Sequence, residues 1–96
     1  MEQKPKTNPE QESVIEYPLD FPIKVMGLNE EALVERLCEV VCKHDPSFEQ
    51  ASGLVVRESS GAKYLGLTFT VYAVSREQLD NLYRELTSHP LVKYVL

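Results

Sequence analysis

The chain has 96 residues, of which 43% are hydrophobic, so it can form one domain around a single core. Its formal net charge of −5 at pH 7 argues against a general nucleic-acid or anionic-membrane binder, since such proteins neutralise phosphates with a basic surface. No stretch approaches the ~18 apolar residues of a membrane span, and the N-terminus lacks the apolar run of a signal peptide. We therefore expect a cytoplasmic protein whose two cysteines are free thiols.

Residues 1–19 are predicted to form a disordered N-terminal extension. This stretch contains three prolines and many polar residues, and it lacks the periodicity that a packed element needs. A solubilising tail explains this composition, although Val14, Ile15 and Tyr17 also offer apolar anchors for a partner-binding peptide. Residues 20–96 are predicted to form the folded domain.

Residues 21–27 alternate between apolar and other side chains, which predicts a first strand. Gly27 is expected to permit a tight turn after this strand, and Asn29 is expected to cap the following helix. Glu30 and Glu31 would then lie in the first helical turn, where acidic side chains suit the helix dipole. The helix itself is indicated by an apolar stripe at helical spacing, formed by Leu33, Leu37, Val40, Val41 and His44.

The strongest strand pattern covers residues 63–74. Its even-numbered positions are small, hydroxylated or aromatic, which is typical of an open sheet face. Residues 54–58 form a shorter strand, and the turn at residues 59–62 joins the two strands in a hairpin. The odd-numbered positions of the long strand are apolar and expected in the core: Leu65, Leu67, Phe69, Val71 and Ala73.

A second helix and a last strand complete the chain. Ser75 and Gln78 form a capping box at the start of this helix. Residues 91–96 are predicted to form the last strand. We expect Val92, Tyr94 and Leu96 on its core side and Leu91, Lys93 and Val95 on its open side.

The resulting element order is β-α-β-β-α-β. With right-handed crossovers and a central third strand, this order predicts an α+β, ferredoxin-like sandwich. Its antiparallel sheet would have the strand order 4-1-3-2, with both helices on one face. The second and fourth strands would lie at the sheet edges, where unpaired backbone groups favour association with another strand.

The sequence also resembles the YbeD-like family of small, mostly bacterial proteins of unknown function. The resemblance covers residues 20–96 and implies a cytoplasmic protein with a ferredoxin-like fold similar to the ACT regulatory domains. The chain departs from the family pattern at Gly61-Ala62, where the glycine would come one residue later, and in its long leader. No catalytic residues carry over. The matching segments are Phe21-Pro22, Lys24 to Gly27, Ser59-Ser60, Lys63-Tyr64, Gln78-Leu79, Tyr83 and Val92 to Leu96.

The open face of the predicted sheet is the first candidate surface for a ligand or partner. Two tyrosines and two lysines on one sheet face exceed what solvation requires, although an ordinary solvated face also commonly carries Thr and Tyr. The residues expected on this surface are Lys24, Tyr64, Thr68, Thr70, Tyr72 and Lys93.

The turn at Gly27 and Asn29 is the second candidate. The ACT-like resemblance implies that this turn lies at a dimer interface and can hold a small amino acid. A helix N-terminus approached by a glycine also suits a carboxylate. A turn glycine followed by a helix cap explains both residues without any ligand.

An RNA-binding, RRM-like module is the alternative from another functional class, because RRM domains share this topology. Their third strand carries aromatic residues that stack on bases. Here Leu65 and Leu67 occupy two of those aromatic positions and are expected to point inward. The acidic net charge also disfavours RNA.

No pattern in the sequence predicts an enzyme. Phosphate-binding glycine loops and nucleophile elbows are missing, and Cys42 and His44 fall on different sides of their helix rather than converging on a metal. We therefore expect a non-catalytic regulatory or interaction module without a cofactor. It would form an ACT-like homodimer, through edge strands or open faces, and bind a small anionic effector or a protein partner.

Overall fold

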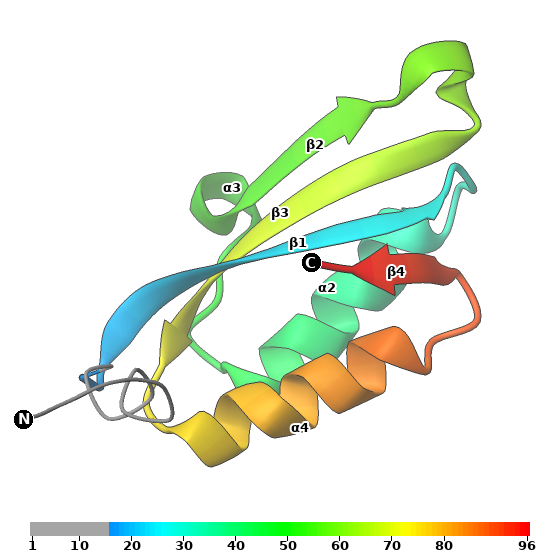
Figure 1. Ribbon diagram of the computed structural model, residues 1–96. Coiled ribbons are helices and arrows are strands. Elements are labelled where there is room, and N and C mark those ends of the chain that lie inside the picture. Colours follow the sequence, from blue (N-terminus) through cyan, green and yellow to red (C-terminus); the bar gives the residue numbers. More distant parts are fainter. Residues whose placement is uncertain (1–15) are drawn as a thin grey trace, which may run out of the picture.

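The computed structural model describes residues 16–96 (Figure 1), so the predicted disorder of residues 1–15 lies outside the described residues. The fold is α+β, as predicted, with one antiparallel sheet in the order β2-β3-β1-β4, which is 4-1-3-2 read from the other edge. The strands are β1 (Leu19–Leu28), β2 (Leu54–Glu58), β3 (Tyr64–Ala73) and β4 (Val92–Val95). The helices are α2 (Leu33–His44), the short α3 (Gln50–Gly53) and α4 (Arg76–Thr87), with a 3₁₀ turn, η1, at Ser60–Ala62.

β1 and β3 form the centre of the sheet and pair along their whole length, from Leu19 opposite Ala73 to Leu28 opposite Tyr64. β1 therefore begins earlier than the predicted residue 21. Tyr17 and Leu19 continue the apolar alternation and pack against the core, so the folded part begins before residue 20. Within residues 16–96, no helix combines the length and the hydropathy that crossing a membrane requires.

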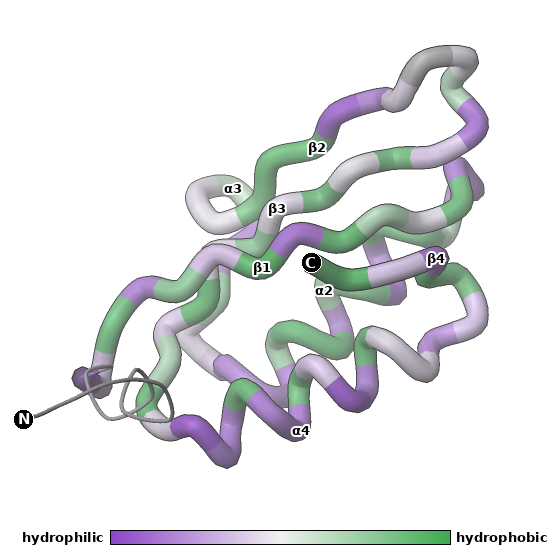
Figure 2. The backbone as a smooth tube through the Cα atoms, in the orientation of Figure 1, coloured by the Kyte–Doolittle hydropathy of each residue, from purple (hydrophilic) through white to green (hydrophobic). Residues whose placement is uncertain are grey.

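The core lies between the sheet and the two long helices. Hydrophobic and hydrophilic residues alternate along β1 and β3 in Figure 2, and the odd-numbered residues of β3 are all buried, as predicted. Leu33, Leu37 and Val41 of α2 are fully buried against them. Each such side chain contributes about 1.5–3 kcal/mol by leaving water. Among the described residues, no helix lies over the opposite face of the sheet (Figure 1).

The connection from β1 to α2 differs from the prediction at both of its marked residues. α2 begins at Leu33, and the preceding Ala32 makes no side-chain cap. Asn29 instead donates from Nδ2 to the carbonyl of Ala62 at 2.7 Å, so it holds the β2–β3 turn and not the helix. Because the helix starts four residues later than Asn29, Glu30 and Glu31 lie before its first turn.

Gly27 lies inside β1, and its predicted role in a tight turn is wrong. A Cβ atom at this position would lie 2.8 Å from Leu33 Cδ1 and 2.9 Å from the Leu91 carbonyl oxygen. The absent side chain therefore allows the start of α2 and the segment before β4 to approach β1 closely.

The predicted facing of β4 is also wrong in part, because the strand contains a β-bulge. Val95 pairs with Val25 and Tyr94 with Met26, but Val92 pairs with Gly27, so Lys93 is an extra residue. One extra residue reverses the side-chain alternation beyond it. Val95 and Leu91 consequently pack toward the core with Val92, while Tyr94 and Leu96 lie on the open face.

Two polar side chains tie the elements together at the end of the sheet near α4. Ser75 Oγ accepts a hydrogen bond from Gln78 N–H at 3.0 Å, which confirms the predicted cap. The Gln78 amide does not bond back to Ser75. It accepts from Val74 N–H at 2.6 Å and donates to the carbonyls of His44 and Tyr72. α4 is thereby attached to both α2 and β3.

Candidate ligand-binding site on the open face of the sheet

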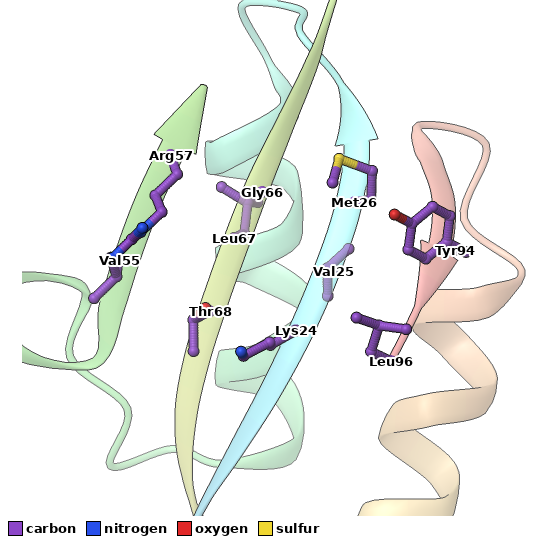
Figure 3. A pocket seen from close by; sticks show the side chains of 10 residues that line it. All are labelled: Lys24, Val25, Met26, Val55, Arg57, Gly66, Leu67, Thr68, Tyr94 and Leu96. Atoms are coloured by element: carbon purple, nitrogen blue, oxygen red, sulfur yellow. The ribbon is translucent and has the colours of Figure 1, made fainter. Parts of the chain in front are cut away.

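A hollow of about 490 Å³ lies on the uncovered face of the sheet (Figure 3). We call it the open-face hollow. All four strands contribute to it, because residues of matching parity on paired strands point to the same face. Val25 and Leu67, whose side chains face the core, contribute to its floor. Its other lining residues are Lys24, Met26, Val55, Arg57, Gly66, Thr68, Tyr94 and Leu96.

Gly66 creates the centre of this hollow. It lies opposite Arg57 on β2 and opposite Met26 on β1. A Cβ atom on Gly66 would meet its nearest atoms, Arg57 O and Met26 Cε, only at 3.8 and 4.0 Å. These are ordinary van der Waals distances, so packing does not require glycine here. The missing side chain leaves space between the side chains of the neighbouring strands.

The walls of the hollow are apolar and exposed. Val55 is 55% exposed, Tyr94 46% and Leu96 72%. Figure 3 shows Val55 on one side, with Tyr94 and Leu96 on the other. Exposed apolar side chains that converge on one concavity are typical of a binding surface, whereas isolated ones are not. The C-terminal residue is held in place because Leu96 N–H donates to Lys24 O at 2.8 Å and Tyr83 Oη donates to Leu96 O at 3.3 Å.

Two cationic side chains, Lys24 and Arg57, also line the hollow. Within residues 16–96, neither side chain forms an ion pair with a carboxylate. Lys24 lies opposite Thr68, and its side chain extends toward this hydroxyl in Figure 3. A guanidinium presents a planar fork that matches a carboxylate or phosphate, and an ammonium adds a compact charge. The hollow therefore combines apolar walls with groups that bind an anion.

The structure separates the candidate residues taken from the sequence. Lys24 and Thr68 line the hollow. Tyr64 lies farther along the open face, where the ammonium groups of Lys63 and Lys93 are 5.8 and 5.5 Å from its ring centroid. That arrangement is a cation–π cluster. Tyr64 and Lys93, which were expected on the candidate surface, therefore contact each other and do not line the hollow.

Thr70 and Tyr72 lie toward the other end of β3, at a separate polar cleft of about 300 Å³. The carboxylate of Asp45 is only 3% exposed there. It accepts hydrogen bonds from Tyr72 N–H at 2.8 Å and from the Ser47 N–H and Oγ–H. These bonds occupy the carboxylate in joining the end of α2 to β3, so this cleft has a structural explanation.

At the Gly27–Asn29 candidate, the Leu33 side chain and the Leu91 carbonyl oxygen lie against Gly27, and Asn29 is bonded to the β2–β3 turn. Five lining residues that sequence reasoning did not assign to the site are Val55, Arg57, Gly66, Tyr94 and Leu96. The hairpin register could have placed the first three, but the bulge in β4 hides the last two.

The two cysteines lie on α2, away from the hollow, and are free thiols as predicted. Burial raises the pKa of the Cys38 thiol, and the neighbouring Cys42 raises it further. The exposed Cys42 donates weakly from Sγ to Phe48 O at 3.9 Å. Among the residues that the structure describes, no cluster of three or more potential metal ligands occurs.

Comparisons with known proteins agree with the resemblance that the sequence motifs suggested. The family described as "Protein of unknown function (DUF493)" matches residues 12–96. The chain is 60% identical to a UPF0250 protein of Janthinobacterium sp. (strain Marseille), over 88% of this chain and 92% of that protein. It is 58% identical to a UPF0250 protein of Bordetella pertussis, over 92% of this chain and 96% of the relative. The chain therefore belongs to the DUF493/UPF0250 family, the YbeD-like family of small bacterial proteins of unknown function.

Proposed function

We propose that the protein is a small non-catalytic binding module that holds an anionic ligand with an apolar body in the open-face hollow. One observation carries this proposal. Lys24 and Arg57 line an apolar concavity without any carboxylate partner among the described residues, on a chain whose net charge is −5. In such an acidic protein, two unpaired cations beside exposed apolar side chains provide local complementarity for an anion.

The chemistry of the hollow indicates the ligand class. A carboxylate would accept hydrogen bonds from the Arg57 fork and the Lys24 ammonium, with the Thr68 hydroxyl nearby. An aliphatic or aromatic body would contact Tyr94 and Leu96 and lie over the space left by Gly66. The volume of about 490 Å³ falls in the ~300–1,000 Å³ range of small-molecule sites.

The ferredoxin-like element order and the resemblance to ACT domains support a regulatory role, in which ligand binding is communicated to a partner protein. A fold by itself does not establish a function, so the argument depends on the hollow. Two free thiols suit the reducing cytoplasm, which supports a cytoplasmic location.

The side chains of the hollow also support a non-catalytic role. Among the described residues that line it, there is no His, Cys, Asp or Glu that could act as a general base or activate a nucleophile. Thr68 lies opposite Lys24 in the β1–β3 pairing, but among the described lining residues no third group orients them as a catalytic set. Binding requires only the charges and shape that are present.

RNA binding is less well supported than anion binding. Leu65 and Leu67, at the positions where an RRM places stacking aromatics, are 8% and 1% exposed. The middle of the open face carries Gly66 and Met26, which offer no aromatic platform. Two cations that attract a carboxylate also attract a phosphate, so the distinction rests on the absence of central aromatics and on the acidic charge.

The proposal is tested by NMR titration of the ¹⁵N-labelled full chain with 3-phenylpropionate, its neutral amide and 3-phenylpropylamine. These probes share one body and differ in charge. We expect saturable shifts at Arg57, Gly66 and Thr68 with the acid alone. The double variant Lys24→Gln/Arg57→Gln should lose them, whereas Arg36→Gln, an exposed cation on α2, should keep them. Equal shifts with all three probes, or shifts that persist in the double variant, would contradict the proposal.

A further inference from the structure

The outer edge of the sheet has an unusual composition at β2. Within residues 16–96, β2 is the last strand on its side, with no element beyond it in Figure 1. Val55 and Val56 are 55% and 45% exposed, and as neighbours in a strand they point to opposite faces. Sheet edges are usually protected by charged side chains (especially Lys), Pro or a bulge, because an apolar edge pairs readily with another strand. β2 has no Lys, Pro or bulge, and its two charges, Arg57 and Glu58, lie together at its C-terminal end.

The hydrogen bonds of the hairpin show which backbone groups of β2 point outward. Ser59 N–H donates to Tyr64 O at 3.0 Å, so residue 59 directs its amide toward β3. In an antiparallel ladder this direction alternates from residue to residue. The backbone groups of Val55 and Arg57 therefore also face β3, whereas those of Val56 and Glu58 and the C=O of Leu54 face away from the sheet. The N–H of Leu54 is already bonded, because it donates to Gln50 O at the end of α3.

We propose that β2 pairs antiparallel with β2 of a second copy of the chain, about a two-fold axis at Val56, so that the two sheets become one. In this register Val56 lies opposite Val56 of the second copy, and Leu54 lies opposite Glu58. Val56 then exchanges two backbone hydrogen bonds with Val56 of the second copy, and Glu58 N–H of each copy donates to the Leu54 carbonyl of the other, whose own N–H remains bonded to Gln50 O. Both half-exposed valines also gain apolar cover at the interface.

Charge explains why the partner is a second copy at this edge. The chain as a whole carries −5, so two copies repel each other over most of their surfaces. β2 contains one cation, Arg57, and one anion, Glu58, and is neutral. In the proposed register Arg57 lies opposite Val55, so no like charges face each other directly. A five-residue strand buries little area, and interfaces below ~1,000 Å² are typical of weak complexes, so we expect concentration-dependent dimers.

Pairing would also extend the open-face hollow. Val55 and Arg57 line its outer side, and the pairing places Arg57 of the second copy opposite Val55 on the same face. A second guanidinium would thus join each anion site, and the two hollows would meet at the two-fold axis. This consequence rests on the proposed function, whereas the strand pairing does not.

Sedimentation velocity of the unliganded full chain, from low to high micromolar concentration, tests the pairing. Val56→Lys and Val56→Pro should each weaken association ~10-fold or more, because they add charge repulsion or remove an outward N–H from each copy. A proline is tolerated at a sheet edge where the N–H faces away from the sheet. Val74→Lys is the matched control, since Val74 is 55% exposed, compared with 45% for Val56, but lies outside β2, and it should behave as the parent.

Cysteine cross-linking tests the register and does not depend on how the first variants fold. In a Cys42→Ser background, Val56→Cys should form a symmetric intermolecular disulfide under mild oxidation. Opposed residues of a hydrogen-bonded pair have Cα atoms ~5.5 Å apart, which suits a disulfide. Val55→Cys, whose counterpart is two positions away from it, should cross-link far more slowly.

A parent chain that stays monomeric at high micromolar concentration would overturn the proposal, as would equal cross-linking at both positions. Because these measurements use no ligand, they separate the pairing from the proposed function. A dimer that gives no shifts with 3-phenylpropionate would remove only the anion site. A monomer that binds the acid would remove only the pairing.

Discussion

Arg57 and Gly66 lie directly opposite each other in the pairing of β2 with β3, and the missing side chain of Gly66 leaves open space on the sheet face between β2 and Met26 of β1. This relationship predicts that Gly66→Val abolishes binding of 3-phenylpropionate by filling the hollow. The variant should fold with equal or greater thermal stability, because glycine in a strand interior costs roughly 0.5–1 kcal/mol. NMR titration and thermal melts provide the two measurements.

The control for this experiment is Thr70→Val, which places the same side chain on β3 near the separate polar cleft. It should leave the titration unchanged. If Gly66→Val still binds the acid with the parent affinity, the ligand does not occupy the open-face hollow.

Two glycines of the sheet, Gly27 and Gly66, test how the fold is packed. Gly27→Ala should lower the free energy of unfolding by about 1–3 kcal/mol, because its Cβ would lie 2.8 Å from Leu33 Cδ1 and the core must shift. Gly66→Ala is the matched control, since its Cβ meets nothing closer than 3.8 Å. Urea denaturation of both variants measures the difference. Equal stability of the two variants would show that α2 moves away at no cost.

Much of this fold is predictable from periodicity alone. The alternation over residues 63–74 is long enough to identify β3 and its buried face, and the bounds predicted for β2 are those found. α3 gives no signal in the sequence, because four residues contain no helical repeat. The helix cap expected at Asn29 is wrong, because an Asn side chain suits a helix cap and a long-range hydrogen bond equally well. Its partner, the Ala62 carbonyl, is 33 residues away and is known only from the folded chain.

The candidate site is less predictable, because it depends on the relative register of four strands. Parity within single strands places Lys24 and Thr68 on one face. The simple alternation of side chains gives the wrong faces in β4, because the extra residue Lys93 places Tyr94 and Leu96 on the open side. A bulge has no reliable signature in one sequence, since it is fixed by how neighbouring strands pack.

Asp45 offers a third prediction, on a buried carboxylate. Asp45→Asn should destabilise the fold by about 1–3 kcal/mol, because an amide replaces one of two accepting oxygens with a donor. Either Tyr72 N–H or the Ser47 donors then lose their acceptor in a place only 3% exposed. Chemical denaturation measures the change. Asp80→Asn, in an exposed 3.7 Å pair with Arg76, should cost much less, and an equal loss would contradict the role of burial.

The last prediction concerns pH and the contact between α2 and α4. Glu85 accepts hydrogen bonds from Lys43 Nζ at 2.7 Å and His44 Nε2 at 2.8 Å. These hydrogen bonds lower the pKa of Glu85 below its ordinary value of 4.5, and the bond from Lys43 has the largest effect. Because the folded state favours the ionised carboxylate, its contribution to stability is present above pH 4.5 and is lost as the pH falls through the lowered pKa.

Urea denaturation at pH 7, pH 5 and pH 3 should therefore show Glu85→Gln less stable than the parent at the two higher values, with the gap closing at the lowest. Glu39→Gln serves as the control, because Glu39 is exposed and its contact with Arg36, at 3.8 Å, lies within α2. It should show a small gap at every pH. A gap for Glu85→Gln that stays constant down to pH 3 would mean that its effect comes from packing, and that the hydrogen bonds from Lys43 and His44 to the ionised carboxylate do not stabilise the fold.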